Sequence, residues 1–324
     1  MRILVVGGAG YIGSHMVKRL LQSGHQVVVF DNLSTGFRDP LVNEWLIEGE
    51  LADPVALDRV FTAKQIDAVM HFASSNLVSE SVSNPALYYR NNVVNTLNLL
   101  DAMVRHGVGY IIFSSTASIF GEPVYVPIDE KHPAQPINPY GRSKLMIEQV
   151  LGDFDRAYGL RSVVFRYFNA AGADPDGTLG ERHEPETHLI PLVLQVASGK
   201  RREITVYGTD YDTPDGTCIR DYIHVTDLCD AHLLALHQLA AGGDSVSYNL
   251  GNGGGFSVQQ VVETARQVTG RDIAVGYGPR RPGDPACLVA DARLAQAELG
   301  WQPRYADLAT IIAHAWQWEL QRTS

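Results

Sequence analysis

Short runs of β-branched and other apolar residues alternate with longer helical patterns through the first 170 residues of the chain. The expected strands are 3–6, 26–30, 68–72, 110–114 and 162–167, and the expected helices are 13–23, 54–63, 85–106 and 139–158. Strands that alternate with helices in this way pair in parallel, and right-handed crossovers place helices on both faces of the sheet. The sequence therefore predicts an α/β fold with a doubly wound parallel sheet.

The composition changes after Asn169, where loops rich in Gly, Pro, Asp and Thr occupy 171–186 and 208–217. Shorter apolar segments lie between these loops, and helical spacing recurs at 189–198 and 225–239. A chain of 324 residues is long enough for about two domains. We therefore expect a first domain over 1–170 and a smaller, mixed α/β domain over 171–324, with segments that can interleave.

A glycine-rich loop joins the first expected strand to the first expected helix. Gly7, Gly8, Gly10 and Gly13 fit both GxGxxG and GxxGxxG, and Asp31 ends the second strand. Such glycines let backbone N–H groups approach a pyrophosphate at the positive end of a helix dipole, while the carboxylate accepts the ribose hydroxyls. Because this carboxylate would repel a 2′-phosphate and no Arg or Lys directly follows it, the Rossmann-type pattern predicts NAD rather than NADP.

A Tyr and a Lys stand four residues apart at the start of the helix expected over 139–158. Asn138 is a suitable N-cap and Pro139 suits the first helical position, so Tyr140 and Lys144 share one face. An adjacent ammonium and the positive charge of a nicotinamide favour the phenolate. The strand before this helix ends in Ser and Thr, at the sheet edge where ligands bind. Tyr140 is therefore the candidate proton acceptor for a sugar hydroxyl.

Charge and cysteine content exclude several kinds of partner. The 26 Lys and Arg against 36 Asp and Glu leave a net charge of −10, which repels polyanions, so we expect no nucleic acid partner. Cys218, Cys229 and Cys287 form no CxxC pair and are odd in number, which favours a reducing cytoplasm over a disulfide framework. The sequence contains no apolar run near 18 residues, so we expect no membrane span or signal sequence.

Two segments resemble metal motifs without matching them. The segment 183–188 begins and ends with His, but its spacing is one residue too long for HExxH, and Pro185 disrupts the helix that this motif needs. Asp174, Asp176 and Glu181 lack the twelve-residue calcium-loop pattern. We therefore expect no metal.

Taken together, these motifs resemble the extended short-chain dehydrogenase/reductase family, and within it the enzymes that epimerise nucleotide sugars. The resemblance covers almost the whole chain, and TPDGTCIRDYIHV is its most specific stretch. The matching segments are 7–13, 31–32, 71–73, 88–93, 114–121, 139–144, 166–169, 207–225 and 280–291. The resemblance implies reversible 4-epimerisation of UDP-glucose and UDP-galactose through a transient 4-keto-sugar, with bound NAD.

The resemblance also implies roles for individual residues. Tyr140 would be the acid and base, Lys144 would orient the cofactor ribose and tune Tyr140, and Thr116 would hydrogen-bond the 4-oxygen of the sugar. The implied NAD-binding residues are Gly7, Gly10, Tyr11, Ile12, Gly13, Asp31, Asn32, Glu50, Leu51, Phe72, Ala73, Asn91, Ser114, Tyr140, Lys144 and Tyr167. The implied residues for the UDP-hexose are Ser75, Asn76, Thr116, Tyr140, Asn169, His188, Leu189, Thr205, Tyr207, Arg220, Arg281, Asp284 and Cys287.

The sequence departs from the family pattern at several positions. Glu50 stands where the family often has an Asp facing the adenine, and Asn76 stands where many members have a Lys. Phe120 replaces a frequent Tyr, and His188 replaces the Asn of some members. A longer carboxylate at Glu50 suits the same contact, whereas any role at Asn76 must pass to neutral hydrogen bonding.

Two further expectations follow from the resemblance. It implies a homodimer that pairs through the helices around 85–106 and 139–158 in a four-helix bundle. The apolar residues of these helices can equally face the chain's own sheet; they are Leu97, Leu99, Leu100, Met146, Ile147 and Val150. The small Cys287, implied to lie near the C2 substituent of the sugar, adds the UDP-N-acetylhexosamine pair as candidate substrates.

Two other functions stay open at this point. A nucleotide-sugar 4,6-dehydratase needs additional carboxylates at the sheet edge, and that family has Asp-Glu after the Thr where this chain has Ala117 and Ser118. A non-catalytic, dinucleotide-sensing regulator on the same fold could dispense with Tyr140 and Lys144, yet both are present. The product formed from UDP-galactose without added NAD distinguishes the three.

Overall fold

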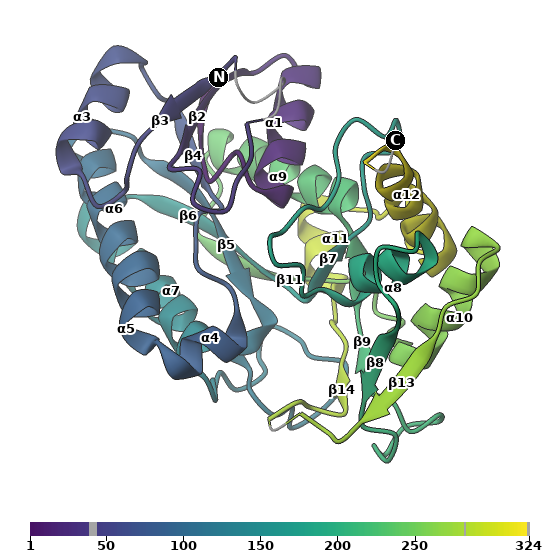
Figure 1. Ribbon diagram of the computed structural model, residues 1–324. Helices are drawn as coiled ribbons and strands as arrows, with labels where there is room; N and C mark the ends of the chain where they lie inside the picture. The colour runs from purple at the N-terminus through teal and green to yellow at the C-terminus, as the bar shows by residue number, and fades with distance from the viewer. Residues whose placement is uncertain (39–43, 282, 323–324) are drawn as a thin grey trace.

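The computed structural model describes residues 1–38, 44–281 and 283–322, and within these residues the chain forms a parallel sheet of seven strands (Figure 1). In chain order the strands are β1 (Arg2–Val6), β2 (Gln26–Asp31), β3 (Leu46–Glu48), β4 (Ala68–His71), β5 (Tyr110–Thr116), β6 (Arg161–Tyr167) and β11 (Val246–Leu250). Their order across the sheet is β11-β6-β5-β4-β1-β2-β3. The predicted fold class is confirmed. The five expected strands are present, with ends that differ by at most two residues.

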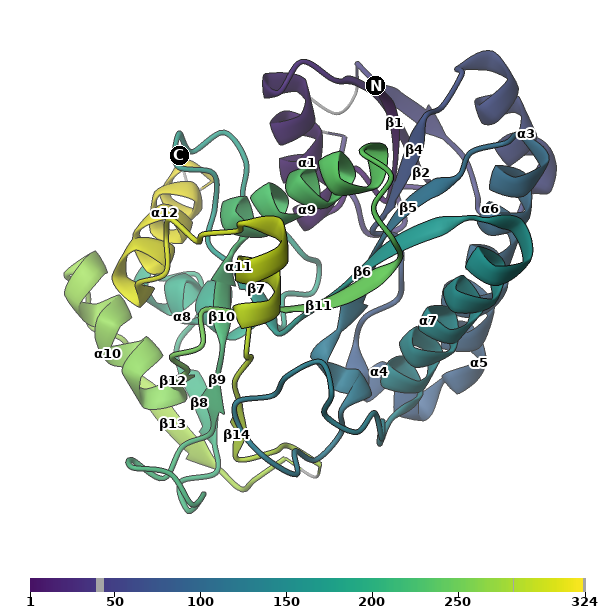
Figure 2. The same cartoon turned by 180° about the vertical axis from the view of Figure 1, so that it is seen from behind.

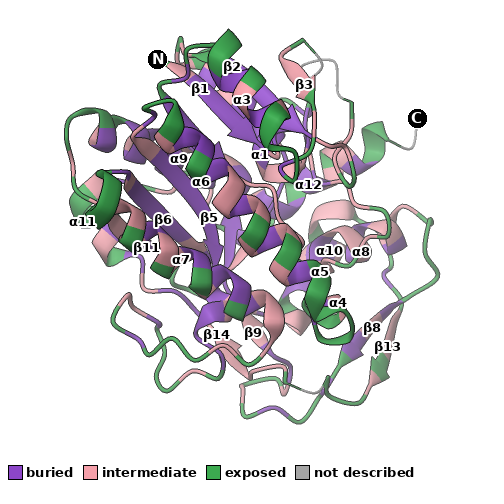
Figure 3. Cartoon of the chain, turned by 90° about the vertical axis from the view of Figure 1, so that its left-hand side faces the viewer, coloured by how far each residue is buried: buried purple, intermediate pink, exposed green. Residues whose placement is uncertain are grey.

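Alternate strand residues pack into two apolar cores on opposite faces of the sheet. Ile3 and Val5 belong to one core, whereas Leu4 and Val6 belong to the other. The helices over the first face are α1 (Tyr11–Gln22) and α9 (Val225–Ala240), and those over the second are α3 (Pro54–Ala63), α6 (Asn95–Arg105) and α7 (Pro139–Tyr158). Figure 3 shows the buried strands between these two helical layers. Burial on both faces explains why the strand sequences are almost continuously apolar.

The helix expected over 85–106 is interrupted, which corrects the prediction of one continuous helix. It consists of α5 (Pro85–Tyr88), a π-helical turn over Tyr89–Val94 and α6, and it follows a short helix α4 (Val78–Ser83). The π turn contains Asn92, whose buried side chain donates to Ser75 O at 3.0 Å and to Ser143 Oγ at 3.0 Å. Periodicity alone does not reveal such a turn, because its cause is a tertiary contact; π turns are frequent at functional sites.

Elements from the second half of the chain form a third apolar core beside the carboxyl end of the sheet (Figures 1 and 2). Its helices are α8 (Leu189–Ala197), α10 (Val258–Thr269) and α12 (Leu308–Gln321). Its paired strands are β7 (Asn169–Ala171) with β10 (Tyr222–His224), β8 (Ile204–Tyr207) with β13 (Val275–Gly278), and β9 (Ile219–Arg220) with β12 (Phe256–Ser257) and β14 (Cys287–Leu288). No helix in the described part of the chain has both the length and the apolar character to cross a membrane.

The chain passes between these two parts more than once. After β10 it returns through α9, which packs against α1, and then through β11, which pairs with β6 at the edge of the large sheet. It leaves again through α10 and comes back at α11 (Arg293–Leu299), which contacts α9 and β11. The two parts therefore share segments from both halves of the sequence.

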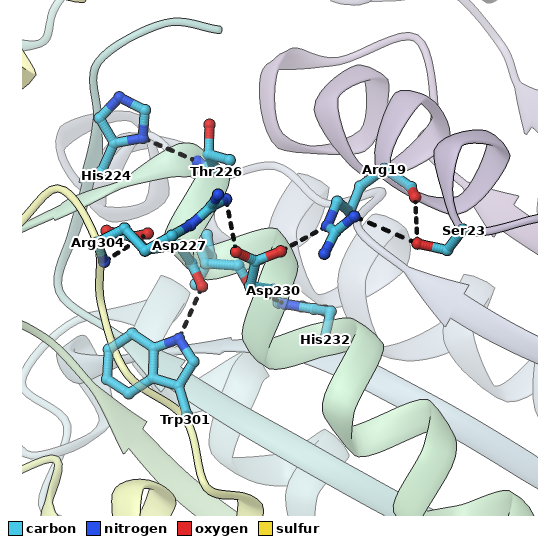
Figure 4. A network of polar contacts seen from close by, with 10 residues as sticks. Arg19, Ser23, His224, Thr226, Asp227, Asp230, His232, Trp301 and Arg304 are labelled. Atoms are coloured by element: carbon cyan, nitrogen blue, oxygen red, sulfur yellow. Dashed lines mark hydrogen bonds and ion pairs between the residues drawn. The ribbon is translucent and has the colours of Figure 1, made fainter. Parts of the chain in front are cut away.

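A polar network fixes α9 against its neighbours (Figure 4). The carboxylate of Asp230 accepts from Arg19 of α1 at 2.5 Å and from Arg304 at 2.8 Å. Asp227 is fully buried, and its carboxylate accepts the backbone N–H of Arg304 at 3.0 Å. The indole of Trp301 donates to the Asp227 carbonyl at 2.8 Å. The helix that follows the glycine loop is thus tied to the second half of the chain.

Candidate active site

The glycine loop lies at the carboxyl end of β1 and leads into α1. Gly7 has φ of +80°, and a Cβ placed on it would lie 2.4 Å from the backbone N of Ala73, in the loop after β4. A Cβ on Gly13 would lie 2.2 Å from Gly7 O. Gly10 is the N-cap of α1, and a Cβ there meets only Gly7 O, at 3.5 Å. The N-terminus of α1 therefore opens onto space that an anion can enter.

Asp31 ends β2 beside this loop. Its buried carboxylate accepts the N–H of Ala9 at 2.9 Å and that of Leu33 at 2.8 Å. Burial raises the pKa of Asp31, and these backbone donors oppose the rise. The neighbouring Asn32 donates to the Glu50 carboxylate at 3.1 Å, so these two expected cofactor residues lie together. The longer side chain at Glu50 therefore reaches the residue that follows Asp31.

The other expected cofactor residues surround the glycine loop or the strand ends next to it. Phe72 and Ala73 donate their N–H groups to Val6 O at 2.8 and 3.1 Å, and Leu51 is buried after β3. The Tyr11 hydroxyl donates to Gly172 O at 2.7 Å, which joins the start of α1 to the loop after β7. Ile12 packs against the apolar core under α1. This glycine turn, helix N-terminus and acidic strand end fit a dinucleotide.

Ser75, in the loop after β4, contacts Asn91 of the π turn. Asn91 donates to Ser75 Oγ at 3.1 Å, and the N–H of Ser75 donates to the Asn92 side chain at 2.9 Å. Asn76, which follows, is exposed. The π turn thus positions one residue expected to contact the cofactor against one expected to contact the substrate.

Tyr140, Lys144 and Thr116 meet at the carboxyl end of β5. Asn138 caps α7 by accepting the Gly141 N–H at 2.8 Å, as the sequence predicts. Lys144 is fully buried, and its Nζ donates to Ser114 O at 2.8 Å. The Thr116 side chain lies close enough to the Tyr140 hydroxyl to lower its pKa. These contacts place the phenol beside the strand end.

The strand residue Ser114 has a second partner on β6. Its side chain hydrogen-bonds the hydroxyl of Tyr167, the last residue of that strand. Ser114 therefore links the ammonium of Lys144, through its carbonyl, to the Tyr167 hydroxyl, through its side chain. These three residues, all expected to bind the cofactor, form one hydrogen-bonded group.

The electrostatics of the Tyr–Lys pair differ from the sequence argument. Burial raises the pKa of Tyr140, and the hydrogen bond from Thr116 opposes this rise. Burial also lowers the pKa of Lys144 to about 7, although the nearby Glu148 favours its charged form. Desolvation acts on both groups, so the lysine alone does not make the phenolate the favoured form. An additional positive charge must supply that bias.

The structure adds residues that sequence reasoning missed. The ring of Tyr88 lies edge-on to Tyr140, with 6.4 Å between centroids. Glu148, which also lies on α7, hydrogen-bonds Ser115 and forms a nearly buried ion pair with Arg166 at 2.6 Å. Glu148 follows Lys144 by four residues, so helical spacing could have signalled it.

A cavity of about 210 Å³ lies in the second part of the molecule. Among its lining residues are most of the expected substrate-binding residues: Asn169, His188, Leu189, Thr205, Tyr207, Arg220, Arg281 and Asp284. Arg220 pairs with Asp284, and the guanidinium of Arg281 lies 4.1 Å from the centroid of the Tyr207 ring. The cavity thus combines cationic side chains with an aromatic surface, as a nucleotide diphosphate requires.

The other expected substrate residues lie outside this lining. Ser75, Asn76, Thr116 and Tyr140 are at the edge of the large sheet. Cys287 is half-buried on β14, where it pairs in register with Ile219, next to Arg220 on β9. The candidate site therefore has a sheet-edge part and a cavity part.

Beside the cavity, the expected substrate residue His188 lies in a cluster with two carboxylates that were not among the expected site residues. His188 Nδ1 lies 2.9 Å from Glu181 and 3.1 Å from Glu186. Burial alone would lower the pKa of His188, but these two carboxylates outweigh it and raise that pKa to about 10. The sequence shows that His188 ends the segment 183–188, but linear spacing cannot show that Glu181 contacts it.

Comparison with known proteins shows the same family over most of the chain. The NAD dependent epimerase/dehydratase family matches residues 3–251. A UDP-glucose 4-epimerase from Halalkalibacterium halodurans is 54% identical over 318 residues, which are 98% of this chain and 95% of the relative.

Two solved structures extend the comparison. A UDP-glucose 4-epimerase from Brucella ovis in complex with NAD has a TM-score of 0.94 and 50% identity, covering 97% of each chain. A UDP-Glc/GlcNAc 4-epimerase from Campylobacter jejuni has a TM-score of 0.86 and 45% identity, covering 99% of each chain. The chain therefore belongs to the NAD dependent epimerase/dehydratase family.

Proposed function

We propose that this chain is an isomerase that interconverts UDP-glucose and UDP-galactose by inverting C4 through a transient 4-keto-sugar. The observation that carries this proposal is the placement of Tyr140 and Lys144 beside Thr116, at the sheet edge that also carries the glycine loop. The names of the relatives at 45–54% identity agree with this activity.

The residues around the glycine loop would hold NAD. The N–H groups at the start of α1 face the space left open at Gly10 and would bind the pyrophosphate. Asp31 would accept the ribose hydroxyls, and its carboxylate favours NAD over NADP. The chemistry that bound NAD supplies is reversible hydride acceptance together with a positive charge.

Tyr140 would remove the proton from the 4-hydroxyl of the sugar and return it to the 4-oxygen at the end of the cycle. Its own pKa is raised by burial, so the phenolate needs cationic surroundings to form. Thr116 would hold the same oxygen, because its side chain already acts on the Tyr140 hydroxyl. Lys144, fixed on Ser114 O, would orient the cofactor ribose and keep a positive charge close by.

The cavity would hold the nucleotide end of the substrate. Arg220 and Arg281 would bind the diphosphate, whose charge the net charge of −10 otherwise repels. Leu189 and Tyr207 would flank the uracil, while Asp284 would orient Arg220. Anchoring the substrate through UDP leaves the hexose free to present either face of C4, as inversion requires.

The two alternative functions receive less support from the geometry. After Thr116 the chain enters a 3₁₀ turn over Ala117–Ile119. Its first two residues are Ala117 and Ser118, at the positions that a dehydratase fills with acidic residues. A sensing regulator does not need a buried lysine aligned with a phenol, yet Lys144 is buried at a desolvation cost. Catalysis explains that cost.

Product analysis tests the proposed function. The purified protein, with the NAD content it retains, is incubated with UDP-galactose and no added NAD, and UDP-glucose should accumulate to an equilibrium mixture without net reduction of cofactor. A 4-keto-6-deoxy product would instead identify a dehydratase, and unchanged UDP-galactose with NAD bound would identify a sensor. The Tyr140→Phe protein serves as the inactive control.

We also propose a homodimer formed through α4, α5, the π turn and α7. Leu99 and Ile147 are buried in the chain's own core, whereas Leu87, Val94 and Met146 are 38%, 50% and 43% exposed on these neighbouring elements. An isologous interface over this face would bury them.

Light scattering should give about twice 35.5 kDa, and Val94→Glu should shift the mass toward that of the monomer. Val55→Glu, on the exposed side of α3, should leave the dimer intact.

Substrate breadth is expected to depend on Cys287. This small side chain is in register with Ile219, the neighbour of Arg220, and is implied to face the C2 substituent, so it leaves room for an N-acetyl group. Cys287→Tyr should lower kcat/KM for UDP-N-acetylgalactosamine by about tenfold or more and change that for UDP-galactose much less, because steric clash discriminates strongly. Equal loss of both activities, or no wild-type activity on the N-acetylated sugar, would contradict this expectation.

A further inference from the structure

The loop between β7 and α8 brings together two His and two Glu side chains at one wall of the cavity. The side chains are those of Glu181, His183, Glu186 and His188, and one ligand atom from each lies within 4.8 Å of the other three. We propose that these four residues bind one divalent transition-metal ion of the zinc class. This proposal concerns a site separate from the residues that carry out the epimerisation chemistry.

The distances from His183 to the two carboxylates match the spacing of ligands around a shared ion, whereas those from His188 lie within hydrogen-bond range. His188 Nδ1 lies 2.9 and 3.1 Å from the two carboxylates, and His183 Nδ1 lies 3.4 and 3.5 Å from the same two. Each ring nitrogen thus faces both carboxylates, although it can donate only one proton. Ligand atoms around tetrahedral zinc are about 3.3–3.6 Å apart, given bonds of about 2.0–2.2 Å.

Charge and burial also favour a cation between these side chains. The side chains of Glu181 and Glu186 are 7% and 6% exposed, and within the described residues neither forms an ion pair with Lys or Arg. His183 Nδ1 is buried and has no hydrogen-bond partner in the part of the chain that the structure describes. Two buried carboxylates carry two negative charges, which a single divalent ion would balance.

The surrounding structure holds the ligands in place. Glu186 Oε1 accepts the N–H groups of Thr187 and His188 at 2.8 and 2.9 Å, which orients the carboxylate and leaves Oε2 to face His183. On the other side of the cluster, the indole of Trp318 on α12 donates to Glu181 O at 3.0 Å. Such outer contacts orient metal ligands in proteins. Hydrogen bonds within the loop and from α12 therefore hold the four side chains together.

The ligand set indicates which metals fit. Two imidazole nitrogens with two carboxylate oxygens suit zinc and its neighbours in the first transition series, whereas magnesium and calcium prefer oxygen ligands alone. The expectation of no metal came from comparing 183–188 with a helical motif. The segment is a loop here, and Glu181 precedes it, so a different ligand geometry is available.

A bound ion would fix one wall of the cavity, since Glu181 and His188 line it together with Arg220. This consequence rests on the proposed function, because the cavity is where UDP would bind. We expect removal of the ion to weaken UDP binding severalfold and to raise KM more than it lowers kcat. The binding of the ion itself does not depend on that function.

Metal analysis of the NAD-containing protein tests the proposal. After treatment with a chelator and desalting, the protein is incubated with ZnSO₄, desalted again and measured by mass spectrometry for metals, and we expect about one zinc per chain. His183→Ala and Glu186→Gln should each lose most of this zinc. Glu184→Gln, an exposed carboxylate in the same loop, should retain it. Circular dichroism and NAD content show that each variant is folded.

Cobalt(II) provides a second measurement that does not depend on activity. Co²⁺ at the four-ligand site should give the intense visible absorption of tetrahedral cobalt, and this absorption should vanish in His183→Ala. Zinc below about 0.1 per chain in the wild type, or equal zinc in His183→Ala and Glu184→Gln, would overturn the proposal. Epimerase activity without metal binding would reject the metal site alone, whereas metal binding without epimerase activity would reject the proposed function alone.

Discussion

Replacing Tyr140 by Phe is expected to lower kcat by about 10²–10⁴ and to leave KM for UDP-galactose nearly unchanged. The variant removes the hydroxyl on which Thr116 acts and keeps the ring that lies edge-on to Tyr88. In the proposed function UDP binds in the cavity with Arg220, and Tyr140 does not line that cavity. The loss should therefore fall on proton transfer. Steady-state kinetics, with NAD content normalised between proteins, measures it.

A matched control is available on the same helix. Tyr158, at the last turn of α7, is 62% exposed, and Tyr158→Phe should retain wild-type kcat and KM. Comparing the two variants separates loss of the catalytic hydroxyl from any general effect of a Tyr to Phe change on α7. Turnover of Tyr140→Phe within a few-fold of wild type would remove Tyr140 from the mechanism.

The parts of the site that local sequence patterns determine could be predicted. A strand that ends in glycines before a helix requires the backbone turn seen at Gly7, and Asn138 with Pro139 fixes where α7 begins. Once those elements are placed, the spacing of Tyr140 and Lys144 puts both on one helical face. The parallel arrangement then brings Thr116, at the end of β5, to the same edge.

The parts that depend on contacts distant in sequence could not be predicted in this way. The π turn arises where Asn92 bonds Ser75 and Ser143, and β11 reaches the sheet only after the chain has built β7 to β10. Desolvation of Lys144 also depends on its surroundings, and it weakens the argument that the lysine by itself favours the phenolate. The sequence shows the types and the spacing of the site residues, whereas burial in the folded chain decides whether their side chains are charged.

Replacing either of two glycines in the GxxGxxG motif by Ala is expected to affect a different property, stability at Gly13 and NAD retention at Gly10. A Cβ on Gly13 would lie 2.2 Å from Gly7 O and 2.8 Å from Gly8 Cα, and backbone atoms cannot move aside without displacing β1 or α1. Gly13→Ala should therefore lower the free energy of unfolding by about 3 kcal/mol or more. Denaturant unfolding of the NAD-free protein measures this loss without any contribution from the cofactor.

Gly10→Ala should leave the protein folded and prevent it from retaining NAD. Gly10 has φ of −80° and ψ of 176°, which Ala adopts readily, and its Cβ would meet only Gly7 O, at 3.5 Å, so stability should change by about 1 kcal/mol or less. The added methyl would occupy the space through which a pyrophosphate reaches the N-terminus of α1. Retention of NAD should fall by about tenfold or more, equivalent to about 1.4 kcal/mol. If Gly10→Ala keeps its NAD, or if Gly13→Ala unfolds no more easily than Gly10→Ala, then the division between a binding glycine and a packing glycine is wrong, because the two variants add the same methyl group three residues apart.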